Sequence, residues 1–108
     1  MKTQLSVARD FSEYPFGRYP AHGPHSGQRF RDEHLLPLLR KKLVVTVDLT
    51  GAKGLAPSFL EEAFGGLVRA GFSEADLQEL LIIRSDLDPS LAEEAWIYVK
   101  DAAQAAVH

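Results

Sequence analysis

The run from Leu43 to Gly71 constrains the fold of this chain more than any other stretch. It starts with an apolar segment from Leu43 to Leu49, rich in β-branched residues, which favours a central strand buried on both faces. A short glycine-containing loop follows, and apolar residues then recur with the period of a helix. These helical positions are Phe59, Leu60, Ala63, Phe64, Leu67 and Val68. The run therefore predicts a strand, a loop and a helix that lies against the sheet.

The remaining segments add further strands and helices in alternation. The other predicted strands are 3–9, a short one at 16–19 and 81–84. The other predicted helices open at Ser26, Ser73 and Asp88, the first reaching about Lys41 and the last about Ala105. Pro37 should kink the first of them or break its last turn, because proline lacks an amide donor. Alternation of this kind predicts an α/β (α+β) fold, a small mixed sheet carrying about four helices in a single domain, residues 1–108.

Composition limits the classes of function. With 108 residues, 45% of them hydrophobic, and no cysteine, the chain can form one core without disulfides. Its formal charge of -3 argues against nucleic-acid binding, and the short basic run Arg40 to Lys42 is explained by the end of a helix, where cations are favourable. No apolar run approaches the roughly 20 residues of a membrane span, and the first residues lack a signal-peptide core. We expect a cytoplasmic protein without membrane contact.

Ser58 has two interpretations that rest on the same helix start. In the first, Ser58 and Glu61 form a capping box, in which each side chain accepts the other residue's amide. In the second, Ser58 carries a phosphate, which the amides and dipole of a helix N-terminus would stabilise. The sequence favours the capping role.

Two adjacent glycines, Gly65 and Gly66, interrupt the same helix. Each costs about 1 kcal/mol relative to alanine, so their presence indicates close approach of another backbone. That backbone belongs either to this domain or to a partner helix, and we favour the first. An oligomer with Trp96, Tyr98 or the glycine pair at its interface is a further possibility that the sequence leaves open.

Several stretches together resemble one known family. They are VVTVDLTGAKGLAPSFLEEAFGGLVRAGF, FGRY, GPHSGQRFRDEHLLPLL and DPSLAEEAW. They resemble the STAS-like domains, a bacterial family of unassigned function. The resemblance implies the fold of STAS domains of the anti-sigma factor antagonist type, a small mixed sheet with helices mainly on one face. In those antagonists the loop corresponding to Leu55 to Phe59 reads Asp-Ser-Ser-Gly or similar, and a partner kinase phosphorylates its first serine.

This chain departs from that pattern at the phosphorylated position. Ala56 stands where the aspartate would be, Pro57 where the phosphorylated serine would be, Ser58 at the second serine and Phe59 at the glycine. The usual switch is therefore not preserved, although Ser58 stays a candidate for phosphorylation. The resemblance implies a non-catalytic regulatory module that binds a protein through the 55–62 loop and helix start. The predicted contact residues are Ala56, Pro57, Ser58, Phe59 and Glu62, and the partner implied is a histidine-kinase-like ATPase of anti-sigma type.

The alternative function is binding of a small molecule or nucleotide by the 14–28 loop. Arg18, Ser26 and the amides of Gly27 and Gln28 could form an anion pocket at a helix N-terminus. A structural explanation competes with it, in which Arg18 pairs with Asp48 or Glu61. His22 and His25 lie in the same loop, but they would need metal ligands from elsewhere. We therefore predict no metal site.

Catalytic patterns are missing from the sequence. It contains no cysteine, no nucleophile-elbow serine motif and no glycine-rich phosphate motif with its lysine. The adjacent glutamates at 61–62 and 93–94 point in different directions on a helix and are expected on solvated faces. We expect no enzyme activity and no cofactor.

Overall fold

The computed structural model describes residues 2–106, and its sheet has three strands in the order β1-β2-β3. These are β1 (Lys2–Ser6), β2 (Val44–Asp48) and β3 (Leu81–Arg84). Val47 of β2 aligns with Leu5 on one side and Ile83 on the other. The α/β class and the central place of β2 are confirmed. Both pairings are parallel rather than mixed, because a helical crossover returns the chain to the same end of the sheet before each new strand.

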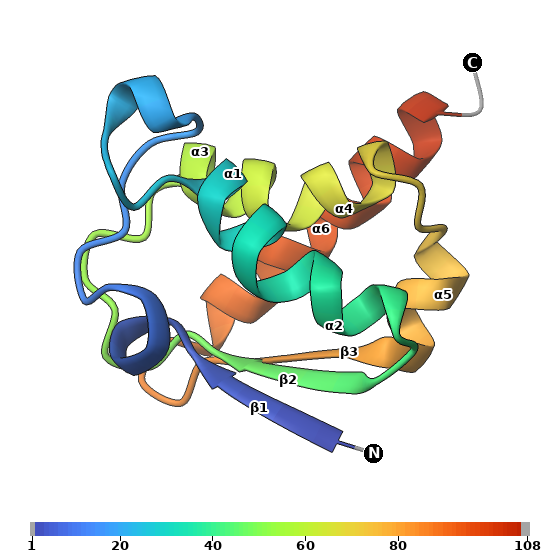
Figure 1. The fold of residues 1–108 in the computed structure, drawn as a ribbon, viewed down its shortest axis with the longest axis horizontal. Coiled ribbons are helices and arrows are strands. Elements are labelled where there is room, and N and C mark those ends of the chain that lie inside the picture. The colour runs from blue at the N-terminus through green and yellow to red at the C-terminus, as the bar shows by residue number, and fades with distance from the viewer. Residues whose placement is uncertain (1, 107–108) are drawn as a thin grey trace.

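Helices cover one face of this sheet (Figure 1). Two of them are each built from three consecutive segments without a break. The first comprises α1 (Gly27–Phe30), η3 (Arg31–Leu35) and α2 (Leu36–Arg40). The second comprises α3 (Pro57–Leu60), η4 (Glu61–Gly65) and α4 (Gly66–Arg69). The others are η1 (Val7–Phe11), η2 (Pro20–His22), α5 (Glu74–Leu80) and α6 (Pro89–Ala106).

Capping side chains define three of the helix starts, as predicted. Ser26 accepts the amide of Arg29, and Ser73 forms a capping box with Asp76. Asp88 accepts the amide of Ser90 at 3.1 Å, at the start of α6. Each cap satisfies an amide that has no partner inside its helix, so these boundaries follow from local sequence.

Pro37 lies inside the first helix, which continues to Arg40. One turn earlier the helix is π-helical, and there the amide of Leu36 donates to the carbonyl of Arg31. A wider turn of this kind gives room for a residue that cannot join the regular hydrogen-bond ladder. The helix therefore absorbs the proline without ending.

The core lies between the sheet and the helices. Val45 and Val47 of β2 are fully buried, as are Phe59, Leu60 and Phe64 of the facing helix. The prediction that β2 would be buried on both faces is wrong, because its alternate residues, including Thr46, are only partly buried. Helices cover only one side of the sheet, so the outer side chains remain partly exposed.

Two predicted strand segments have other structures. β1 ends at Ser6 instead of Arg9, because the Ser6 hydroxyl accepts the amide of Arg9 and Asp10 accepts the amide of Ser6, starting the helical turn η1. The segment 16–19 is not a strand. Its backbone hydrogen bonds are made within its own loop and with the start of α1, including Phe16 N to the carbonyl of His25 at 2.9 Å.

The glycine pair packs inside the domain, as favoured from the sequence. A Cβ atom at Gly65 would lie 3.2 Å from the carbonyl oxygen of Tyr98 in α6, and one at Gly66 would overlap the guanidinium group of Arg31. Gly65 thus permits close approach of α6, and Gly66 leaves space for an arginine.

Within residues 2–106 no helix has the length and apolarity that crossing a membrane requires.

Candidate functional site

Three loops meet at the end of the sheet where all three parallel strands finish (Figure 1). Hydrogen bonds join them to one another or to the strands beside them. Leu49 N donates to the carbonyl of Arg84 at 2.7 Å, Asp86 N to Thr50 Oγ1 at 2.9 Å, and Lys53 N to the carbonyl of Glu13 at 2.7 Å. We call residues 12–26, 49–58 and 85–88 the loop surface. Binding sites of open α/β sheets commonly lie at this end of the strands.

The loop surface exposes most of the large apolar side chains that the fold leaves in solvent. Of six such side chains among the described residues, four lie here: Tyr14 (64% exposed), Phe16 (62%), Tyr19 (45%) and Leu87 (84%). The ammonium group of Lys53 lies 5.5 Å from the centre of the Tyr14 ring. Exposed aromatic side chains beside cations are typical anchors of protein interfaces.

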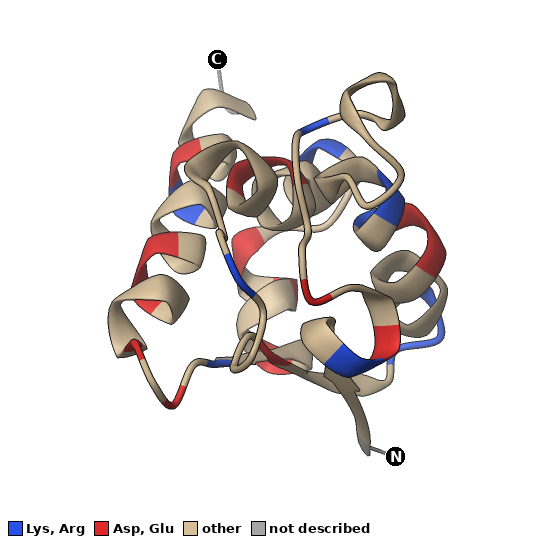
Figure 2. Ribbon diagram, turned by 90° about the vertical axis from the view of Figure 1, so that its left-hand side faces the viewer, with Lys and Arg blue, Asp and Glu red and all other residues tan. Residues whose placement is uncertain are grey.

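Figure 2 looks onto this end of the molecule, where basic and acidic residues both occur along the ribbon. The described residues contain no group of three or more side chains suited to holding a metal ion. His22 instead accepts the amides of Arg18 and Tyr19 at its Nδ1 atom, at 3.3 and 3.2 Å. This histidine therefore shapes its own loop.

Ser58 does not cap the helix that follows the central strand. The helix begins one residue earlier, at Pro57, and its N-cap is Ala56, which has no side-chain oxygen. Ser58 is therefore the second residue of the helix and is partly exposed. The capping box with Glu61 is wrong, because proline is favoured at the first helical position and moves the start of the helix forward.

Two of the five predicted contact residues point inward. Phe59 is fully buried against Phe30, with ring centres 6.1 Å apart, and Glu62 is 5% exposed. Neither can be part of an exposed docking surface in this fold. Ala56 and Ser58 are partly exposed, and Pro57 is exposed, so these three residues of the loop surface are accessible to a partner.

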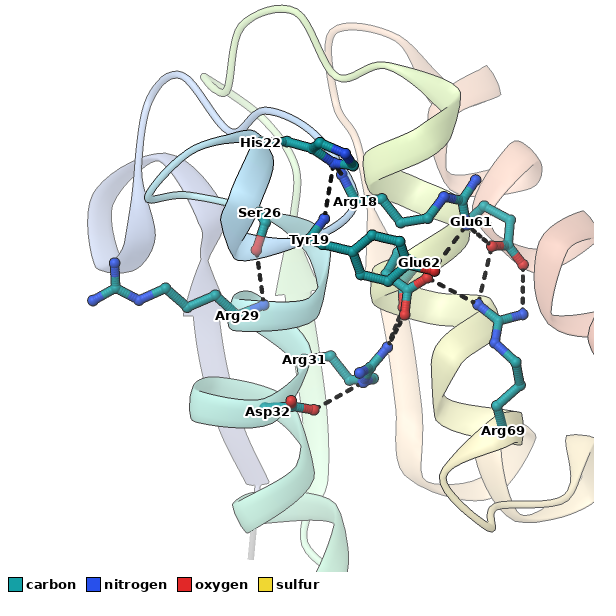
Figure 3. A network of polar contacts seen from close by, with 10 residues as sticks. All are labelled: Arg18, Tyr19, His22, Ser26, Arg29, Arg31, Asp32, Glu61, Glu62 and Arg69. Carbon is teal, nitrogen blue, oxygen red and sulfur yellow. Dashed lines mark hydrogen bonds and ion pairs between the residues drawn. The ribbon is translucent and has the colours of Figure 1, made fainter.

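Glu62 is buried and Glu61 is only partly exposed, in contrast to the solvated face expected from sequence. Both belong to a network with three arginines (Figure 3). Arg69 binds Glu61 through two hydrogen bonds of 2.8 and 3.0 Å, and Arg18 bonds to the same carboxylate. Arg31 binds Glu62 at its carboxylate (2.5 Å) and its carbonyl (3.0 Å). The network thus joins the loop, the first helix and the second helix.

Charge inside this network is balanced. Its arginines, Arg18, Arg31 and Arg69, face the carboxylates of Glu61, Glu62 and Asp32, the last at 2.9 Å from Arg31. The hydrogen bond from Arg69, opposed by burial and supported by Arg18, holds the pKa of Glu61 below its usual value. The hydrogen bond to Glu61 likewise raises the pKa of Arg18. Three guanidinium groups thus face three carboxylates, and no positive charge is left over for a ligand.

The anion pocket expected around Arg18, Ser26 and Gly27 has its donors occupied. The amide of Gly27 donates to the carbonyl of Gly17 at 2.9 Å, and that of Gln28 to the carbonyl of Arg18 at 3.0 Å. Ser26 is fully buried as a helix cap. The competing explanation, in which Arg18 pairs with Glu61, is the one found. A Cβ atom at Gly27 would come 2.7 Å from the carbonyl of Phe59, so this glycine serves helix packing.

Comparison with protein families gives one match. A family model described as a STAS-like domain of unknown function (DUF4325) matches residues 26–90, more than half of the 108 residues. The chain belongs to this family. The part of the STAS-like domain that matches runs from the start of α1 to the start of α6 and includes the loop before α3. No curated protein and no solved structure gave a match.

Sequence reasoning missed Tyr14, Phe16 and Leu87 as surface residues of the STAS-like domain. A signal was present, because each stands among loop-forming residues: Tyr14 and Phe16 flank Pro15, and Leu87 lies between Asp86 and Asp88. Large apolar residues in such positions have no periodic partner and are candidates for exposure. The roles of Arg31 and Arg69 had no comparable signal, because their partners are 31 and 8 residues away in the sequence.

Proposed function

We propose that this STAS-like domain is a non-catalytic, regulatory protein-interaction module of the bacterial cytoplasm. The observation that supports it is the group of exposed apolar side chains on the loop surface, among them Leu87, Tyr14 and Phe16. Large apolar side chains exposed together at one end of a small domain commonly mark a binding site for another protein. Ala56, Pro57 and Ser58 belong to the same loop surface and contribute to the contact.

The partner to test first is a histidine-kinase-like ATPase of anti-sigma type. This choice comes from the likeness to anti-sigma factor antagonists, and family membership alone does not supply it. Ser58 remains a candidate for phosphorylation by such a partner. It is partly exposed in the first turn of α3, where amides without helical partners would stabilise a phosphate. Mass spectrometry after incubation with the ATPase and ATP would detect the modification, with Ser58→Ala as the control.

The docking prediction is tested by calorimetric titration with purified ATPases of this type from the same bacterium. We expect Phe16→Ser and Leu87→Ser each to weaken binding by about tenfold or more, because anchor residues carry most of an interface's energy. Ile82→Ser is a matched control, since Ile82 is equally an exposed apolar residue (45%) but lies on the outer face of the sheet.

Unchanged affinity of both loop variants would contradict the loop surface as the docking site. Absence of binding by the unaltered chain would contradict the partner class. Equal weakening by Ile82→Ser would mean that the contact extends over the sheet and is not specific to the loops.

A further inference from the structure

Helix α6 (Pro89–Ala106) lies along one flank of the molecule (Figure 2). Its inner side, which includes the buried Ala95 and Val99, packs on the core. Its outer side carries an apolar residue in the middle, Ile97, which is 55% exposed. A helix with one side in the core ordinarily keeps polar residues on the other, so Ile97 breaks the amphipathic pattern.

Ile97 borders a shallow groove of about 370 Å³ between α5 and α6. The groove is lined by Glu74, Gln78, Glu93, Trp96, Ile97 and Lys100. Its centre is apolar, from Trp96 and Ile97, and its ends on α6 carry opposite charges. This arrangement has the anatomy of a small interface, with an apolar middle and a charged rim.

The two charges are placed symmetrically about the apolar pair. Glu93 precedes Trp96 by three residues, and Lys100 follows Ile97 by three residues. Seven residues along a helix correspond to about two turns, or roughly 10 Å, so both charges are on one side but cannot meet within the helix. Neither forms an ion pair with any residue of the described range 2–106. Both remain available to a second molecule.

We propose that this face binds a second copy of the chain, with the two α6 helices antiparallel and a twofold axis passing between Trp96 and Ile97. A twofold contact joins the same patch on both subunits, so the patch must complement itself. In the antiparallel arrangement Glu93 of each copy meets Lys100 of the other, and Ile97 of each enters the groove beside the other's Trp96. This pairing is independent of the loop surface and leaves that surface free for a different partner.

Charge reversal tests the proposal by sedimentation velocity. The unaltered chain should sediment as a dimer. Glu93→Lys and Lys100→Glu should each dissociate it, because every new contact joins like charges. Mixing these two variants in equal amounts should restore a dimer, since one then presents two lysines and the other two glutamates. Ile97→Asp should give a monomer that mixing does not rescue.

Glu79→Lys and Lys41→Glu are the matched controls, because they make the same charge changes at exposed positions outside the groove lining. Both should remain dimeric. Circular dichroism should find all variants folded, since every substituted side chain is exposed. A monomeric unaltered chain at millimolar concentration, a dimer that survives Ile97→Asp, or a mixture that stays monomeric would each overturn the proposal.

Discussion

Among the described residues, Glu62 is the one charged side chain that the fold buries, with 5% of its surface exposed. Its carboxylate is compensated by Arg31, whose side chain is itself only 12% exposed. Burying a charge is costly unless it is paired and hydrogen-bonded, and here the pairing spans two helices. A residue that resembles a surface glutamate in sequence therefore becomes a structural contact between elements.

Replacing Glu62 by alanine should lower the free energy of unfolding by about 3 kcal/mol, because the largely buried Arg31 would lose its buried carboxylate partner and keep only the exposed Asp32. Urea denaturation followed by circular dichroism measures this change. The control is Glu33→Ala, which removes a helix-surface pair with Arg29 whose side chains are 53% and 43% exposed. That loss should stay below about 1 kcal/mol. Equal losses in the two variants would contradict the structural role of Glu62.

Helix starts in this domain use two different local solutions. Ser26 and Ser73 place a hydroxyl on a free amide of the first turn. The helix after β2 instead begins with Ala56 and Pro57, where the proline has no amide to satisfy and its backbone angle already suits a helix. The helix therefore needs no serine cap, and the side chain of Ser58 does not act as one.

Alanine substitutions should separate these two kinds of start. Ser73→Ala should cost about 1 kcal/mol of stability, the usual effect of removing a capping hydroxyl. Ser58→Ala should leave stability unchanged within the error of a urea titration, because no capping bond of the helix involves its side chain. A loss in Ser58→Ala as large as that in Ser73→Ala would restore the capping interpretation of Ser58.

At the scale of the whole molecule, two ionised carboxylates, Glu61 and Asp48, contribute to stability. The pKa of Glu61 is lowered, first by its hydrogen bond with Arg69. Burial works to raise the pKa of Asp48, but hydrogen bonds from Thr50 and the nearby Arg84 and Arg9 outweigh it, so this pKa is also lowered. A carboxyl group with a lowered pKa contributes stability above its unfolded-state pKa and loses it as the pH falls through the folded value.

The free energy of unfolding should therefore be nearly constant from neutral pH down to about pH 5 and decrease at lower pH. Urea titrations at a series of pH values would measure it. Glu61→Gln should be less stable at neutral pH and should show a smaller decrease on acidification, because its amide does not titrate. An acid dependence identical to that of the unaltered chain would contradict a contribution from Glu61.

Local sequence predicted the parts of the fold that depend on neighbouring residues. Propensity and capping act within a few residues, so the sequence showed the β-branched run of β2 and the apolar period of the second helix. For the same reason it showed the helix caps at Ser26, Ser73 and Asp88. Family membership was also visible from the central run, and the match over residues 26–90 confirms it.

Tertiary structure alone decided which charged side chains meet and which loop residues lie together. The sequence by itself could not place the carboxylate of Glu62 inside, choose between Asp48 and Glu61 as the partner of Arg18, or bring Arg31 to Glu62, because these contacts join segments far apart along the chain. Nor could it gather Tyr14, Phe16 and Leu87 at one end of the molecule. That convergence follows from three parallel strands ending together, which is a property of the sheet and not of any single segment.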